Sequence, residues 1–165
     1  KAMGLKTEVD KIFLERLLVV TRPSQTYLTA APGPAHILFN ISGGAVEITD
    51  LGAVVTGAVV GAPTIDCTIN GIAVDDDSAP ACNGAIGTVI WVPLDPQGTI
   101  VNALAIPKVV TTAAKCDTRC TSVIAGIQPA TVGTIVANLT TATSLTLQWF
   151  VVYRRLSPNS NIAVA

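Results

Sequence analysis

The fold of this chain is decided by the stretch Ser144-Leu-Thr-Leu-Gln-Trp-Phe-Val-Val-Tyr-Arg-Arg155. Every second residue in it is apolar: Leu145, Leu147, Trp149, Val151 and Tyr153. A period of two places these side chains on one face of a β-strand. The other face begins polar at Thr146 and Gln148 but becomes apolar at Phe150 and Val152. We therefore expect a long strand that is either central in a sheet or covered by another subunit.

The chain before this strand repeats the same kind of pattern from Thr26 onward. Short β-branched runs are separated by Gly, Pro, Asn and Asp, and no segment between them has a helical period. The Ser42-Gly43-Gly44 turn predicts that the first two runs form a hairpin. The expected strands are 37–41, 46–48, 53–60, 64–70, 86–92, 99–104, 108–112, 121–127, 131–139 and 144–155. This number and spacing predict an all-β fold, an antiparallel β-sandwich of jelly-roll type over residues 23–165.

The N-terminal segment has a different pattern. Its apolar residues are spaced by three or four positions: Leu5, Val9, Ile12, Phe13, Leu17 and Val20. This spacing predicts an amphipathic helix over 5–20, ended by Arg22-Pro23, so that residues 1–22 form a helical arm. Alternatively, the β-branched run 17–21 is already a strand. The helix could either contact a partner or cover its own sandwich.

Composition limits the classes of partner. The chain has 165 residues, of which 50% are hydrophobic and 13% charged, with a net charge of −1. The charged fraction is well below the roughly 25% of an average soluble domain, which favours a surface partly covered by neighbours. No basic stripe interleaved with aromatic residues indicates nucleic-acid binding. The longest uncharged apolar run, 51–64, is shorter than the roughly 20 residues of a membrane helix.

Residues that could carry chemistry are few. His36 is the single histidine and has no nucleophile motif nearby, so we expect no catalytic residues, no cofactor and no enzyme activity. Asp75, Asp76 and Asp77 could supply oxygen ligands for calcium, but their spacing is not that of an EF-hand. We expect a solvated acidic loop there and no metal site.

The four cysteines are Cys67, Cys82, Cys116 and Cys120. Their spacing does not match that of zinc fingers or ribbons. Two disulfides are one interpretation, Cys67 with Cys82 and Cys116 with Cys120. Four reduced and buried thiols are the other, because a particle assembled in a reducing cytoplasm starts in that state.

Two segments carry a resemblance to a known group of proteins. The ending 144–165, with Trp149, Tyr153, Pro158 and an apolar tail from Ile162, resembles the endings of structural proteins of tailed bacteriophages. The stretch 35–51 resembles their first hairpin. The resemblance implies a virion component, either a capsid decoration (cement) protein or a fibre-like appendage, usually trimeric and often with a helical N-terminal part.

From this resemblance and the low charge we expect a decoration protein at the capsid surface, extracellular after release. It would bind the major capsid protein or other virion proteins and stabilise adjacent capsomers through trimeric, non-catalytic contacts. The predicted contact residues are Val9, Phe13, Leu17, Phe150, Val152, Ile162 and Val164. The alternative is a tail-fibre, spike or head-fibre domain that binds host-surface glycans or another virion protein. That alternative requires exposed aromatic residues, whereas Trp91 and Trp149 lie in apolar strands that we expect to be buried.

Overall fold

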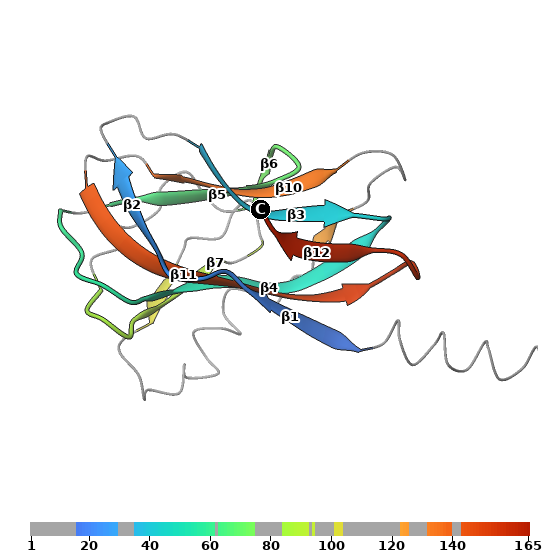
Figure 1. The fold of residues 1–165 in the computed structure, drawn as a ribbon, viewed down its shortest axis with the longest axis horizontal. Helices are drawn as coiled ribbons and strands as arrows, with labels where there is room; N and C mark the ends of the chain where they lie inside the picture. Colours follow the sequence, from blue (N-terminus) through green and yellow to red (C-terminus); the bar gives the residue numbers. More distant parts are fainter. Residues whose placement is uncertain are drawn as a thin grey trace, which may run out of the picture.

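The computed structural model describes residues 16–29, 35–61, 63–74, 84–92, 94, 101–103, 123–125, 132–139 and 143–165. The described residues form strands and contain no helix (Figure 1). The strands are β1 (Leu17–Thr21), β2 (Gln25–Thr29), β3 (Ala35–Ser42), β4 (Val46–Val55), β5 (Ile65–Ile69), β6 (Ile72–Ala73), β7 (Val89–Val92), β8 (Val101–Ala103), β9 (Val123–Ala125), β10 (Gly133–Leu139), β11 (Thr143–Arg155) and β12 (Asn161–Val164).

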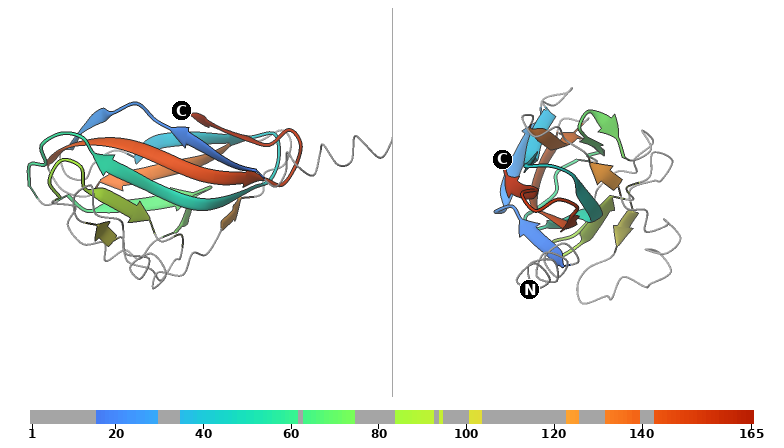
Figure 2. Two further views of the ribbon diagram at one scale, coloured as in Figure 1. Left: turned by 90° about the horizontal axis from the view of Figure 1, so that it is seen from below. Right: turned by 90° about the vertical axis from the view of Figure 1, so that its right-hand side faces the viewer.

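These strands form two antiparallel sheets. Sheet A has the order β1-β11-β4-β7-β8, with β2 also paired to β11 and β9 also paired to β4. Sheet B has the order β12-β3-β10-β5-β6. The two sheets lie over one another as layers, with β1 and β12 close together along one side (Figure 2). The prediction of an all-β chain with antiparallel sheets is confirmed.

β11 is the central strand that its sequence predicts. It pairs with β4 on one side and with β1 and β2 on the other. All of its inward-facing side chains are buried: Leu145, Leu147, Trp149, Val151 and Tyr153. They belong to a single core cluster with inward residues of both sheets, among them Phe39, Ile48, Leu51, Ile65, Ile90 and Ile135. The core between the sheets is thus built from the alternating positions of the sequence.

The hairpin expected around Gly43 and Gly44 is not formed. β3 belongs to sheet B and β4 to sheet A, so the two strands do not pair. Both glycines have positive φ, 72° and 130°, a conformation that side-chain-bearing residues rarely adopt. They carry the chain from one layer to the other. The turn signal was correct, but the partners of the two strands are set by long-range pairing with β10, β12 and β11.

The prediction of a helix over 5–20 is wrong for the C-terminal part of that range. Leu17–Thr21 is strand β1 of sheet A, as the alternative interpretation of the β-branched run had it. Residues 5–15 lie outside the described residues, as does the expected strand 108–112. The two strands expected at 46–48 and 53–60 are one continuous strand, β4, which ends at Val55.

Two β-bulges reverse the alternation inside long strands. Opposite β11, Val152 pairs with Asp50 and Tyr153 with Ile48, so Thr49 is the extra residue of β4. Opposite β10, Ile135 pairs with Phe39 and Val136 with Ile37, so Leu38 is the extra residue of β3. Leu38 is therefore buried next to Phe39, and Ile37 is turned outward with 49% exposure.

Candidate functional site

The outward side of sheet A carries a patch of apolar side chains. Opposite residues of antiparallel strands project on the same face, so the alternation of buried core residues identifies the outward ones. The patch, called the A face below, consists of Leu17, Val19, Val54, Val89, Trp91, Phe150 and Val152. Leu17 and Val19 are 56% and 63% exposed, and the other five are half-buried. Two polar residues, Asp50 and Gln148, project on the same side, opposite Val152 and Val54 respectively. Large apolar groupings on an outward face are features of many binding surfaces.

An aromatic pair forms the centre of the A face. The rings of Phe150 and Trp91 meet edge to face, with centroids 5.2 Å apart and planes at 82°. Gly52 lies between them in the register, opposite Phe150 on one side and Trp91 on the other. A Cβ atom on Gly52 would lie 2.7 Å from the Phe150 ring and 2.6 Å from the Ile90 carbonyl oxygen. The glycine therefore lets the Phe150 ring lie flat across β4.

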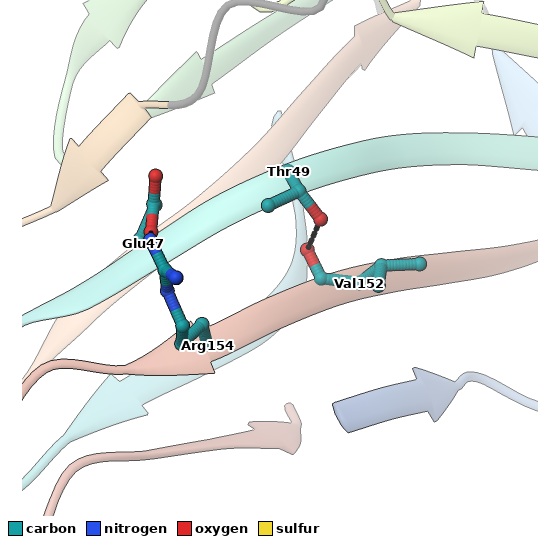
Figure 3. Close-up of polar contacts among 4 residues, drawn as sticks. All are labelled: Glu47, Thr49, Val152 and Arg154. Carbon is teal, nitrogen blue, oxygen red and sulfur yellow. Dashed lines mark hydrogen bonds and ion pairs between the residues drawn. The ribbon is translucent and has the colours of Figure 1, made fainter. Parts of the chain in front are cut away.

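One end of the A face is polar and its groups bond to one another. Arg154 of β11 and Glu47 of β4 form an ion pair, with Nε donating to the carboxylate at 2.7 Å. Thr49, the bulge residue, donates its hydroxyl to the Val152 carbonyl oxygen at 3.3 Å (Figure 3). The bulge thus leaves the Thr49 hydroxyl beside the Val152 carbonyl oxygen.

The opposite end of the sheet carries hydroxyl groups. The hydroxyls of Thr26 and Thr146 are 3.0 Å apart, and Thr56 donates to the Thr146 carbonyl oxygen at 3.4 Å. Ser24 and Thr56 are also hydrogen-bonded through their hydroxyls. The A face therefore has an apolar centre between two polar ends, which is the anatomy of many protein–protein interfaces.

Sheet B presents a different outward side. Its outward positions are mostly polar: Asn40, Asp66, Thr68, Thr134 and Asn138, with Val136 and the exposed Ile37 beside them. All five polar residues are half-buried members of the strands. The outward side of sheet A therefore has more apolar side chains than that of sheet B, although it also carries Thr21, Asp50 and Gln148.

Three of the predicted contact residues lie together on this face. Leu17, Phe150 and Val152 are on neighbouring strands, although they were predicted from different elements of the sequence. Ile162 is 2% exposed and belongs to the core, so its side chain is not available to a partner. Val164 is 39% exposed on β12. Val9 and Phe13 lie outside the described residues.

Sequence reasoning missed four members of the A face: Val19, Val54, Val89 and Trp91. Val19 follows Leu17 at a spacing of two, but the helical interpretation of 5–20 hid that alternation. Trp91 was expected to be buried, and it is half-buried on the outward side instead. Trp149, at 1% exposure, is buried as expected. A strand segment as short as Val89–Val92 does not reveal from its sequence which of its faces points inward.

Arg22 fastens the corner where β1, β2, β3 and the end of β12 meet. Its Nη1 donates to the carbonyl oxygens of Leu38 at 2.8 Å, Ala165 at 3.1 Å and Ile37 at 3.2 Å. Its Nε and Nη2 donate to Gln25 Oε1 at 3.2 and 3.1 Å. The Leu38 bulge exposes the carbonyls that Arg22 binds. A shallow hollow next to this corner is lined by Arg22, Pro23, Ser24, Gln25 and Val164.

His36 lies beside this corner. Its ring packs edge to face on Tyr27, with centroids 4.8 Å apart, and its buried Nε2 has no hydrogen-bond partner among the described residues. Burial lowers the pKa of His36, and the positive charge of Arg22 lowers it further. Burial likewise raises the pKa of Tyr27.

The remaining candidate residues give no site in the described part of the chain. Cys67 is fully buried in β5 and contributes to the core. Cys82, Cys116, Cys120 and the acidic stretch from Asp75 to Asp77 lie outside the described residues, so both interpretations of the cysteines stay predictions. No group of three His, Cys, Asp or Glu side chains suited to a metal ion occurs in the part searched, which is the described part. The same part holds no helix long and apolar enough to cross a membrane.

Comparison with known proteins gives no relative from which a role could be carried over. Neither protein-family models, nor curated proteins, nor solved structures match this chain.

Proposed function

We propose that this chain is a non-catalytic structural protein, an antiparallel β-sandwich of jelly-roll type that binds another protein through the A face. The observation that carries this proposal is the contrast between the two outward sides. The outward side of sheet A has seven apolar side chains, with an aromatic pair among them and Asp50 and Gln148 beside them, whereas the outward side of sheet B is mostly polar.

The A face has the physical properties that association needs. Burial of apolar surface contributes about 25 cal/mol per Å² removed from water. Aromatic residues held at the centre of a contact commonly provide most of the binding energy. Trp91 and Phe150 hold this position, and Gly52 and the strand ladder fix their geometry, so little conformational entropy is lost when a partner covers them.

Within this proposal the protein is a capsid decoration protein of a tailed bacteriophage. It would form a homo-oligomer, a trimer by the resemblance, and bind the major capsid protein so that adjacent capsomers are held together. The basis is the resemblance of segments 35–51 and 144–165 to phage structural proteins, together with the low charged fraction of 13%. Permanent interfaces are more apolar than transient ones, which fits this composition.

The proposal is tested with one substitution on each outward side. Val152→Glu places a charge in the A face, and Thr68→Glu places the same charge at a half-buried outward position of sheet B. Light scattering would measure the oligomeric state, and co-sedimentation would use empty heads of the phage whose genome encodes the chain. We expect Val152→Glu to lose at least tenfold in binding and Thr68→Glu to retain it. A folded wild-type monomer that does not sediment with the heads would contradict the proposal.

One observation favours a second function, the binding of host-surface glycans by a fibre or spike domain. Trp91 is half-buried on an outward face, where a sugar ring could stack on it. Binding of the purified protein to host cells and to a glycan array would test this. Loss of such binding in Trp91→Ala, with no binding of wild type to heads, would favour the fibre role over decoration.

A further inference from the structure

The edge of sheet A next to the A face has backbone groups that pair with no strand in the described part of the chain. The Arg22 amide donates to the Trp149 carbonyl oxygen at 2.8 Å, and the register then pairs Val20 with Val151 and Leu18 with Tyr153. In an antiparallel pair the residues alternate between bonding to the partner strand and facing away from it. Leu18, Val20 and Arg22 therefore bond to β11, and Leu17, Val19 and Thr21 turn their N–H and C=O groups to the other side. On that side no described strand pairs with β1.

β1 also lacks the features that normally protect an edge strand. Natural edges are shortened, bulged, or interrupted by proline or charge. β1 pairs with β11 over five residues without a bulge, and Leu-Leu-Val-Val-Thr contains neither proline nor charge. By comparison, the strands β6 and β8 at the far ends of the two sheets have only two and three residues. β12 lies next to β1 near Arg22 but does not pair with it.

The side chains of this edge extend the A face. Leu17, Val19 and Thr21 are exposed on the same side of the sheet as Val152 and Phe150. A strand added to β1 would satisfy the outward backbone groups and would cover Leu17 and Val19 with its own alternate side chains. Such strand addition obtains its affinity from main-chain hydrogen bonds and its specificity from those side chains.

The charges at the two ends of β1 indicate the kind of strand. Arg16 is exposed immediately before β1. Arg22 follows β1, and its guanidinium keeps its positive charge there because the acceptors that it binds at the corner are neutral. If two copies paired antiparallel about Val19, Arg16 of each copy would lie opposite Arg22 of the other, and like charges opposite each other destabilise a pair. We propose that β1 is the acceptor edge for an extended strand of a different protein, apolar at alternate positions and acidic at its ends. This inference rests on the proposed function, because it takes from it that the partner of the chain is a protein.

The test uses two short peptides, EVTVTVE and its basic counterpart KVTVTVK, with the full chain. We expect the acidic peptide to bind at least tenfold more tightly than the basic one at low salt. On binding, hydrogen exchange of the Leu17, Val19 and Thr21 amides should slow at least tenfold. The Leu18 and Val20 amides, which already bond to β11, should change little.

Two variants at one position make the test specific. Val19→Pro removes an N–H that points away from β11, so the sheet should fold with an unchanged melting temperature while peptide binding is lost. Val19→Thr keeps both the N–H and the β-branched shape, and it should bind like the wild type. If Val19→Pro does not fold, Val19→Glu, which keeps the backbone and adds a negative charge that repels the acidic peptide, replaces it with the same expected loss.

The outcomes separate this inference from the proposed function. Equal or absent binding of both peptides, or exchange that slows elsewhere, would overturn the acceptor edge. A wild-type dimer that Val19→Pro converts to a monomer would also overturn it, since the occupant would be a second copy. If Val152→Glu abolishes binding to heads while Val19→Pro retains it, the proposed function stands and the acceptor edge fails. If the acidic peptide binds at β1 but the wild-type protein does not bind to heads, the acceptor edge stands and the proposed function fails.

Discussion

At the scale of single residues, Gly52 has the largest consequence for the A face. Its missing side chain leaves room for the Phe150 ring, and a Cβ atom there would be too close to both that ring and the Ile90 carbonyl oxygen. We expect Gly52→Ala to lower the free energy of unfolding by about 1–3 kcal/mol, as overpacking does. Urea denaturation would measure this.

The double variant Gly52→Ala/Phe150→Ala supplies the control for that prediction. The double variant removes the Phe150 ring but leaves the contact of the new Cβ atom with the Ile90 carbonyl oxygen. We therefore expect Gly52→Ala to lower the free energy of unfolding less in the Phe150→Ala background than in the wild type. Equal losses in both backgrounds would show that Phe150 does not depend on Gly52.

His36 makes stability depend on pH. Burial, and then the charge of Arg22, lower its pKa in the folded state, so the unfolded chain binds a proton more readily. The contribution of neutral His36 is fully present above its ordinary pKa of about 6.5 and is lost as the pH falls through the lower, folded value. We expect the urea midpoint to fall between pH 7.5 and pH 5.5. Because His36 is the single histidine, His36→Gln should flatten this change, and an identical slope would contradict the assignment.

At the scale of elements, the long strands are joined by side-chain hydrogen bonds at their β-bulges as well as by regular backbone pairing. The Leu38 bulge frees carbonyl groups of β3, and Arg22 binds them together with the Ala165 carbonyl at the end of β12. In sheet A, the bulge residue Thr49 donates a hydrogen bond from its hydroxyl to the Val152 carbonyl oxygen. Each bulge is thus accompanied by a side chain that satisfies the local backbone.

Removal of the Arg22 side chain should loosen this corner. We expect Arg22→Ala to cost about 1–3 kcal/mol, because several part-buried acceptors lose their donor. Hydrogen exchange should increase most in β12 and around the β3 bulge. Arg16→Ala removes an exposed arginine of the same chain segment and should change stability by no more than about 0.5 kcal/mol. Equal effects of the two substitutions would mean that Arg22 does not fasten the corner.

At the scale of the whole molecule, the two sheets share one core but differ in their outward sides. The inward residues of both sheets belong to a single cluster, so neither sheet has a core of its own. Among the described strands, those of sheet A place the A face next to β1, whose outer side pairs with no described strand, and the two features adjoin at Leu17 and Val19. A partner that covers one of these features therefore lies next to the other, which is why substitutions at Val152 and Val19 are both needed to separate their roles.

Much of the fold could be read from the sequence, because the alternation of apolar residues is a local property. It identified β11, its buried face and most of the other strands, and it brought Phe150 and Val152 into the candidate site. The β-branched run at Leu17 indicated β1 only as an alternative, since helical spacing and strand alternation overlap in so short a segment.

The remainder depended on contacts between residues far apart in the chain. Pairing decided that β3 and β4 lie in different sheets, that Leu38 and Thr49 are bulges, and that Trp91 faces outward beside Phe150. The sequence by itself determined that the chain forms β-strands and which side of its longest strand is buried, because those follow from side-chain period. Which strands are neighbours depends on long-range pairing, which side-chain period does not specify. That pairing places the A face beside an edge to which no described strand is paired.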